Sequence, residues 1–207
     1  EIDTNASTYR GSIKLEHALN VFNVDVRGKR ALDIGASTGG FTYVLLEHGA
    51  IKVCAVDVGH LQFDNELRSD PRVELHEGIN ARYIKPDDFG LFDIITIDVS
   101  FISLTKILEP VLKCLENGGV CIALIKPQFE AGPENLNKNG IVTDKSVHFK
   151  VLNNIIDYIL RIGYTATGLI PSPVKGKSGN TEYFTRISLH GIWDFEIEPA
   201  INSAFLD

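Results

Sequence analysis

The sequence predicts an α/β protein with a doubly wound, mostly parallel seven-stranded sheet, helices on both faces and an antiparallel last strand. The first observation is a set of five nearly continuous apolar runs interspersed with helical patterns, at 31–34, 53–57, 72–76, 92–98 and 120–126. Such runs are typical of parallel strands buried on both faces. Two further runs, 165–171 and 182–189, are joined by a segment too short for a crossover helix, which predicts an antiparallel pair.

Helical patterns occupy most of the spaces between these runs. The first, at 12–22, places Leu15, Ala18, Leu19 and Phe22 at helical spacing. Further helices are expected at 39–48, 61–68, 103–116 and 146–162. We therefore expect a lead-in with a helix over 1–28, an α/β domain over 29–190, and an acidic, loosely attached tail over 191–207.

Composition and charge describe an ordinary globular protein and exclude some classes. The 207 residues carry 27 acidic and 20 basic side chains, a net charge of -7. No run reaches the roughly 18 apolar residues of a membrane span, so a membrane protein is not expected. The acidity is local, because the net charge is -5 over 57–93 and -4 over 191–207 but +2 over 94–190. The total charge therefore argues against a uniformly basic surface without excluding an RNA partner.

Cysteines and histidines point to neither a metal site nor a disulfide. Cys54, Cys114 and Cys121 lie inside apolar stretches without a CxxC pair, which indicates core residues in a reducing, cytoplasmic compartment. The six histidines lack metal-ligand spacing, so no metal is expected. The chain begins at Glu1 and contains no methionine, from which we expect a piece of a longer protein with modules upstream.

Chemically active side chains collect where the predicted strands end. Ligands of a doubly wound sheet bind outside the carboxyl ends of its strands. The first strand ends in a glycine turn over 33–40, and the second, fourth and fifth strands end at Asp57, Asp98 and Lys126. If the last strand is antiparallel, its beginning brings Glu182 to the same edge. The topology alone therefore gathers four ionisable residues beside a turn at which a ligand can approach the backbone.

The glycine turn fits neither of two phosphate-binding motifs. A P-loop needs Lys followed by Ser or Thr after its last glycine, but Phe41 and Thr42 follow here. A dinucleotide GxGxxG needs glycine where Ser37 stands.

A third interpretation of the turn stays open. The residues GASTG at 35–39 match GxSxG, the nucleophile elbow of α/β-hydrolases, and Asp98 with His148 or His190 would preserve the order Ser, Asp, His. That elbow normally follows several strands, whereas this turn follows the first.

Asp57 and Lys126 each have a functional and a structural interpretation. An acid about twenty residues after a glycine turn accepts hydrogen bonds from the ribose of an adenosine-type cofactor, although a solvated strand-end acid is the simpler alternative. Lys126 closes an apolar strand, where desolvation and a neighbouring cation would lower its pKa and favour a general base, although a lone strand-end lysine is usually solvated. The neighbouring turn and Asp98 favour the functional interpretation in both cases.

Six blocks of the sequence resemble one family. They are DIGASTGGFT (33–42), AVDVGH (55–60), IDVSFISL (97–104), IKPQFEAG (125–132), KNGIV (138–142) and SPVKGKSGNTEYF (172–184). In this order they are similar to the TlyA family, the haemolysin-named branch of the FtsJ-like ribosomal RNA methyltransferases. The resemblance covers about 9–190 and implies a class I S-adenosylmethionine-dependent, Rossmann-like methyltransferase fold.

The resemblance also implies an activity and its residues. The implied reaction is 2'-O-methylation of ribose in ribosomal RNA, and the family's catalytic tetrad corresponds to Lys14, Asp98, Lys126 and Glu182. The implied contacts with the cofactor S-adenosylmethionine are Asp33, Gly35, Ser37, Gly39, Gly40, Asp57, Asn80 and Asp98. The implied partners are ribosomal RNA and a ribosomal subunit, without membrane or metal. Family members usually carry an N-terminal S4-like RNA-binding domain, which this sequence lacks.

Two other functions are alternatives. The haemolysin name suggests a membrane-active toxin, but the sequence shows no basic amphipathic helix and no secretion signal. The chain could also be a catalytically silent ribosome-assembly factor, against which the intact lysines and acids argue.

Overall fold

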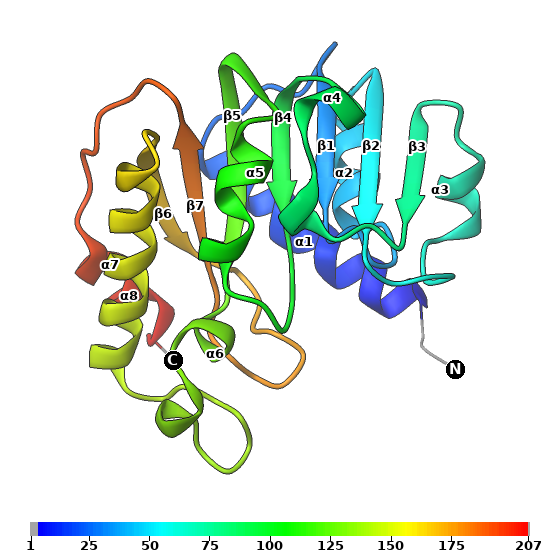
Figure 1. The fold of residues 1–207 in the computed structure, drawn as a ribbon. Coiled ribbons are helices and arrows are strands. Elements are labelled where there is room, and N and C mark those ends of the chain that lie inside the picture. The colour runs from blue at the N-terminus through cyan, green and yellow to red at the C-terminus, as the bar shows by residue number, and fades with distance from the viewer. Residues whose placement is uncertain (1–3, 207) are drawn as a thin grey trace.

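Within residues 4–206, which the computed structural model describes, seven strands form one mixed sheet in the order β3-β2-β1-β4-β5-β7-β6 (Figure 1). The strands are β1 (Arg30–Ile34), β2 (Lys52–Asp57), β3 (Val73–Glu77), β4 (Phe92–Ile97), β5 (Leu115–Ile125), β6 (Thr165–Pro171) and β7 (Tyr183–Ser188). Strands β1 to β5 are parallel, and β7 runs antiparallel to both β5 and β6. The predicted fold class and the antiparallel last strand are confirmed.

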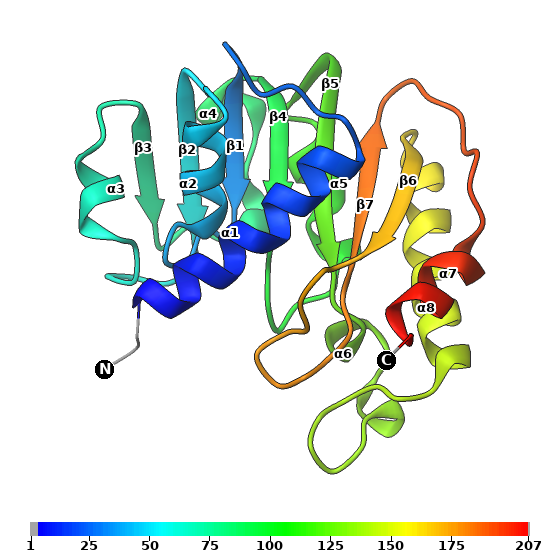
Figure 2. The ribbon, with the colours of Figure 1, turned by 180° about the vertical axis from the view of Figure 1, so that it is seen from behind.

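Helices cover both faces of the sheet (Figures 1 and 2). The α-helices are α1 (Thr4–Val21), α2 (Gly40–Glu47), α3 (Asn65–Ser69), α4 (Pro86–Phe89), α5 (Leu108–Leu112), α6 (Pro127–Glu130), α7 (Lys145–Arg161) and α8 (Ile197–Ala204). Three 3-10 turns are η1 (Ala81–Tyr83), η2 (Leu104–Lys106) and η3 (Pro133–Asn135). Figure 2 shows α1 crossing one face of the sheet beside α2, whereas α5 and α7 lie on the other face.

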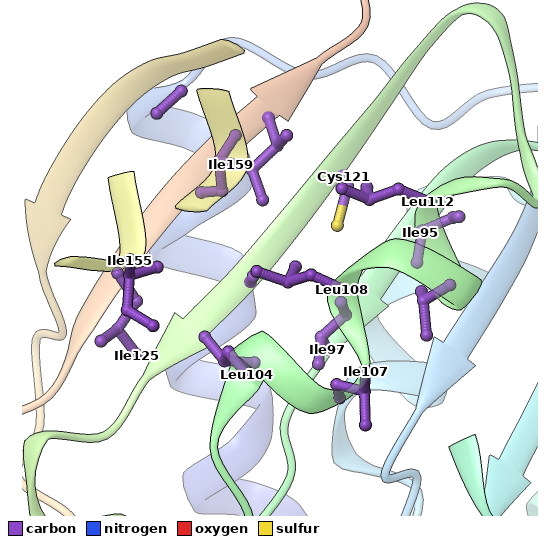
Figure 3. Packing of buried hydrophobic residues seen from close by; sticks show 14 of the residues in the cluster. Ile95, Ile97, Leu104, Ile107, Leu108, Leu112, Cys121, Ile125, Ile155 and Ile159 are labelled. Carbon is purple, nitrogen blue, oxygen red and sulfur yellow. The ribbon is translucent and has the colours of Figure 1, made fainter. Parts of the chain in front are cut away.

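The largest hydrophobic cluster lies between the sheet and the α5–α7 layer. Figure 3 shows residues of β4 and β5 packed against η2, α5 and α7, labelled Ile95, Ile97, Leu104, Ile107, Leu108, Leu112, Cys121, Ile125, Ile155 and Ile159. A second cluster on the opposite face buries Leu15, Ala18 and Leu19 of α1. The predicted helical spacing of these three residues is thus confirmed, and their burial fixes α1 across the sheet.

Two predicted helices are wrong in extent. The helix expected over 61–68 is only α3, five residues long, because Asp64 caps it at Glu66 and Leu67, and Leu61 has a positive φ of 59°. The helix expected over 103–116 is divided into η2 and α5, and β5 begins at Leu115, five residues before the expected strand. The apolar residues of this segment do pack on the sheet, so the spacing predicted burial correctly and not helix length.

The predicted loosely attached tail is also wrong. Within 191–207, α8 buries Ile197, Ala200 and Ile201 in the largest cluster, next to α7 and β6. The apolar face is confined to one short helix, and the acidic residues around it made the segment read as a tail. The outer residues 1–3 and 207 of the predicted lead-in and tail lie outside the described part of the chain.

The three cysteines are core residues, as predicted. All three are free and buried. Burial raises the thiol pKa of Cys54 to about 12 and that of Cys114 to about 11. Among residues 4–206, no helix is long and apolar enough to cross a membrane.

Candidate functional site

Two adjoining cavities open at the carboxyl ends of the parallel strands. The Asp57 cavity, of about 500 Å³, is lined by the turns after β1 to β4. The tetrad cavity, of about 550 Å³, is lined by Lys14, Asp98, Lys126 and Glu182 together with nearby loops. The wall common to both consists of Gly35, Ser37, Asp98, Ser100 and Phe101. Groups bound in the two cavities would therefore meet at Asp98.

The turn after β1 lies very close to the end of β4. Gly35 has a φ of +80°, and a Cβ added to it would lie 2.2 Å from the Asp98 carbonyl oxygen. Gly39 has a φ of +99°, and a Cβ there would lie 2.4 Å from Leu67 Cδ1. Both positions favour glycine because a side chain at a positive φ is strained, and at Gly35 it would also collide with the backbone of Asp98. Gly40, the first residue of α2, lines the tetrad cavity.

Asp57 is oriented by the backbone at the mouth of its cavity. Its Oδ2 accepts a hydrogen bond of 2.7 Å from the Ser37 amide, and its Oδ1 accepts one of 2.6 Å from the Gly59 amide. A carboxylate has about four lone-pair positions, so this leaves acceptors for ligand hydroxyls.

The remaining wall of the Asp57 cavity is largely apolar. Asn80 lies at the rim, where its Oδ1 accepts from the Arg82 amide at 3.0 Å and caps η1. The apolar lining includes Val58, Ile79, Val99, Ile102 and Ile107. A mostly apolar lining with a few well-placed polar groups is typical of a small-molecule site.

Asp33 occupies a different place from the one expected. Its side chain is 0% exposed and lines neither cavity. Its Oδ2 accepts from the Thr42 hydroxyl at 2.7 Å, and its Oδ1 accepts from the Thr96 hydroxyl at 2.9 Å. Burial raises the pKa of Asp33 to about 6, although these two hydrogen bonds oppose the shift. Asp33 thus supports the turn from beneath.

The four tetrad residues form two lysine–carboxylate pairs. Lys14 Nζ lies 2.6 Å from Glu182 Oε2, and their side chains are only 7% and 2% exposed. Lys126 Nζ lies 2.5 Å from Asp98 Oδ1, with side chains 11% and 23% exposed. The predicted convergence of these residues on one edge is therefore found, and Lys14 reaches it from α1, a helix on the face of the sheet.

Each pair has a neutral partner that the sequence interpretation missed. The Lys126 ammonium donates to Ser100 Oγ at 3.0 Å, and the Gln128 carboxamide donates to Glu182 Oε1 at 3.0 Å. Both lie within the blocks 97–104 and 125–132. Both residues therefore belong to the motifs noted in the sequence, but the spacing of those motifs did not show which side chain each residue would contact.

Glu130 joins the two loops that carry Asp98 and Lys126. Its carboxylate accepts from the Ser103 hydroxyl at 2.6 Å and from the Leu104 amide at 2.8 Å. Burial raises the pKa of this carboxyl above its usual range. Glu130 therefore ties the end of α6 to the loop after β4.

Two longer loops form the outer wall of the tetrad cavity. The Asn180 side chain, in a residue only 1% exposed, accepts from the Val142 amide at 3.1 Å and donates to the Gly140 carbonyl at 2.9 Å. It thereby joins the loop before α7 to the loop between β6 and β7. A Cβ on Gly176 would lie 2.4 Å from Glu182 Oε1, so this glycine lets the second loop pass over the carboxylate.

Phe101 stands between the two cavities. It has a positive φ of 63° and is 89% exposed, and its ring centroid lies 5.0 Å from that of Phe129. A large side chain in the left-handed region stores strain, which is usual where function requires a particular orientation. An exposed aromatic face here could stack on a planar ligand.

The nucleophile-elbow alternative is wrong. His148 is 0% exposed, with Nε2 on the Val142 carbonyl at 3.0 Å and Nδ1 on the Tyr183 hydroxyl at 3.0 Å. His190 follows the end of β7, which lies at the opposite edge of the sheet from Ser37 because β7 is antiparallel. Neither histidine can serve Ser37 as a base.

Comparison of the sequence with known proteins identifies one family. The sequence profile of the FtsJ-like methyltransferases matches residues 8–188. The chain belongs to this family. YqxC of Bacillus subtilis, named as an rRNA methyltransferase, is 47% identical over 88% of this chain and 66% of its own length. TlyA of Mycobacterium tuberculosis H37Rv, named as a 16S/23S rRNA (cytidine-2'-O)-methyltransferase, is 42% identical over 84% of this chain and 66% of its own length.

Solved structures share the fold of this chain. A crystal structure of a Lactococcus lactis protein described as a haemolysin has a TM-score of 0.90 and 42% identity, and the match covers 94% of this chain and 96% of that one. More distant methyltransferase structures, at 18% identity or below, share the fold. The predicted resemblance and the methyltransferase fold class are thus confirmed. The chain spans about two thirds of the length of the curated relatives YqxC and TlyA.

Proposed function

We propose that this chain catalyses S-adenosylmethionine-dependent 2'-O-methylation of ribose in ribosomal RNA, with cytidine as the nucleotide named for the TlyA relative. The observation that carries the proposal is the pair of lysine–carboxylate contacts, Lys14–Glu182 and Lys126–Asp98, beside the wall common to the two cavities. Methylation of a hydroxyl is assisted by a base that accepts its proton and by a group that orients its oxygen toward the methyl donor. The two lysines beside the common wall can supply both.

S-adenosylmethionine would bind in the Asp57 cavity. Asp57 would accept hydrogen bonds from the ribose hydroxyls, and the apolar slot beside Asn80 would hold the adenine ring. Gly35, Ser37 and Asp98 would face the part of the cofactor nearest the second cavity. When bound, the cofactor supplies an electrophilic sulfonium methyl group.

Lys126 would act on the target 2'-hydroxyl. In its neutral form the amine would accept the hydroxyl proton as the ribose oxygen displaces the cofactor's thioether sulfur from the methyl carbon, and the proton would then pass to water. Asp98 stabilises the resulting ammonium at 2.5 Å, and Ser100 orients it. Among the described residues, Lys14 Nζ has Glu182 as its one hydrogen-bond acceptor, so it has further N–H groups with which to orient the hydroxyl.

A methyl-transfer assay tests this role. With tritiated S-adenosylmethionine and undermethylated ribosomal subunits, Lys126→Ala should lose at least about 100-fold in rate, because the proton acceptor is gone. Cofactor affinity, measured by calorimetry, should change little. The matched control is Lys113→Ala, which removes an exposed lysine paired with Glu109. Normal transfer by Lys126→Ala would reject the assignment.

The two alternative functions receive less support. The haemolysin name belongs to relatives of this chain. A silent assembly factor has no need of two ordered lysine–carboxylate pairs. Leakage from liposomes would favour the first alternative, and binding to ribosomal subunits without methyl transfer would favour the second.

A further inference from the structure

The Gln128 side chain reaches from the beginning of α6 to the carboxylate that holds Lys14. Its Nε2 lies 3.0 Å from Glu182 Oε1, and Gln128 lines the tetrad cavity two residues after Lys126. We propose that Gln128 is a positioning residue that acts through Glu182 on the Lys14 ammonium. The proposal rests on the function proposed above, because the position of Lys14 matters only if it orients the attacking hydroxyl.

The orientation of the Gln128 carboxamide follows from the chemistry of its partner. Glu182 carries the ammonium of Lys14 on Oε2 at 2.6 Å, so it is an ionised carboxylate that can only accept hydrogen bonds. The amide nitrogen of Gln128 must therefore face Glu182. Its Oε1 is buried and has no hydrogen-bond partner within the described residues.

The unpaired Oε1 indicates that the amide nitrogen, and not the oxygen, is the functional group of Gln128. A buried acceptor without a partner is costly, and an apolar side chain of the same shape would avoid that cost. What glutamine offers over such a side chain is its donor. That donor is aimed at the second oxygen of Glu182.

Two donors on opposite oxygens restrict the Glu182 carboxylate. Lys14 occupies Oε2 and Gln128 occupies Oε1, so rotation of the carboxylate breaks one contact or the other. Because Gln128 follows Lys126 in the chain, it also links the two lysine–carboxylate pairs. The separation of the two amines is thereby set by α6 as well as by the packing of α1.

Substitution of Gln128 tests the link without RNA. Gln128→Met keeps an unbranched side chain and removes the donor. Acetylation of Lys14 by a limiting amount of acetic anhydride, followed by mass spectrometry, should become about threefold faster or more in this variant, with Lys113 as the internal reference. An unchanged rate at Lys14 would overturn the proposal, whatever the protein methylates.

Methyl transfer supplies the second readout. Gln128→Met should lower kcat about tenfold with unchanged affinity for S-adenosylmethionine. Gln128→Glu, which places a second carboxylate opposite Glu182, should lower kcat further. A kcat that stays at the wild-type value in both variants would contradict a role through Glu182.

A double-mutant cycle separates this role from simple packing. In a Glu182→Gln background, Gln128→Met should cost nothing further, because the group through which it acts is already lost. Combined with Ser100→Ala, which acts on the other pair, the two losses should multiply. If Gln128→Met lowered kcat by the same factor in the Glu182→Gln background as in the Ser100→Ala background, the proposal would be overturned. If the wild type transfers no methyl group while Gln128→Met still speeds the acetylation of Lys14, the proposed function fails and the positioning role stands.

Discussion

The two cavities that meet at Gly35 and Asp98 are built in different ways. The Asp57 cavity is formed by successive turns after β1, β2, β3 and β4, each close in sequence to the strand that places it. The tetrad cavity instead brings Lys14 of α1 against Glu182, 168 residues away. The first cavity is a product of the sheet topology, whereas the second also depends on how α1 packs across the sheet.

The largest expected effect concerns the buried pair that holds the second cavity together. Glu182→Gln leaves the Lys14 ammonium buried without its counter-charge, which should lower the free energy of unfolding by about 3–5 kcal/mol. Asp98→Asn breaks the less deeply buried pair, with side chains 11% and 23% exposed, and should cost about 1–3 kcal/mol. Urea denaturation measures both. Equal losses would mean that the two pairs do not differ as their burial indicates.

The next effect concerns the point at which the cavities touch. Gly35→Ala places a Cβ against the Asp98 carbonyl and should lower the free energy of unfolding by about 3 kcal/mol, with weaker S-adenosylmethionine binding as well. The control is Gly118→Ala, at a φ of +86° with no atom within 4 Å of the added Cβ, which should cost about 1 kcal/mol. Similar losses of stability in both variants would mean that the positive φ accounts for the whole effect and that contact of the added Cβ with the Asp98 carbonyl contributes nothing.

The third effect, which appears only over part of the pH range, is a pH dependence beneath the first cavity. The pKa of Asp33 is raised to about 6 in the folded protein from a usual value of 3.8. The folded state therefore binds more protons than the unfolded state between these values, and stability falls as pH rises through them, by up to about 3 kcal/mol. Asp33→Asn should remove this pH-dependent contribution to the free energy of unfolding. Its stability relative to the wild type should rise from pH 4 to pH 7 in urea denaturation.

Two comparisons check the Asp33 prediction. Asp87→Asn, at an exposed position, is the matched control and should stay parallel to the wild type over the same pH range. A constant difference between Asp33→Asn and the wild type would show that Asp33 is not the group responsible.

The sequence was informative where function depends on strand order. Apolar runs located the sheet, and the ends of those runs located Asp57, Asp98 and Lys126, because a parallel sheet brings such ends to one edge. Glu182 followed from the short connection between the last two strands. Asp33, also at a strand end, was misplaced because its burial depends on the hydroxyls of Thr42 and Thr96, which only the folded packing brings to it.

Long-range side-chain contacts could not be predicted from spacing. Lys14 was identified only through a family resemblance, since nothing in the helical pattern of α1 indicates a partner beside β7. Gln128 and Asn180 were missed because their roles depend on which backbone or carboxylate they meet across the site. The apolar face of α8 was missed because it is short and carries acidic neighbours.

The most direct test of the proposed function is the position of the transferred methyl group. Ribosomal RNA incubated with this chain and isotopically labelled S-adenosylmethionine can be digested to nucleosides and analysed by mass spectrometry. The account predicts label in 2'-O-methylcytidine, and none when Lys126→Ala replaces the wild type. Label on a nucleobase, or no label although S-adenosylmethionine binds, would contradict it.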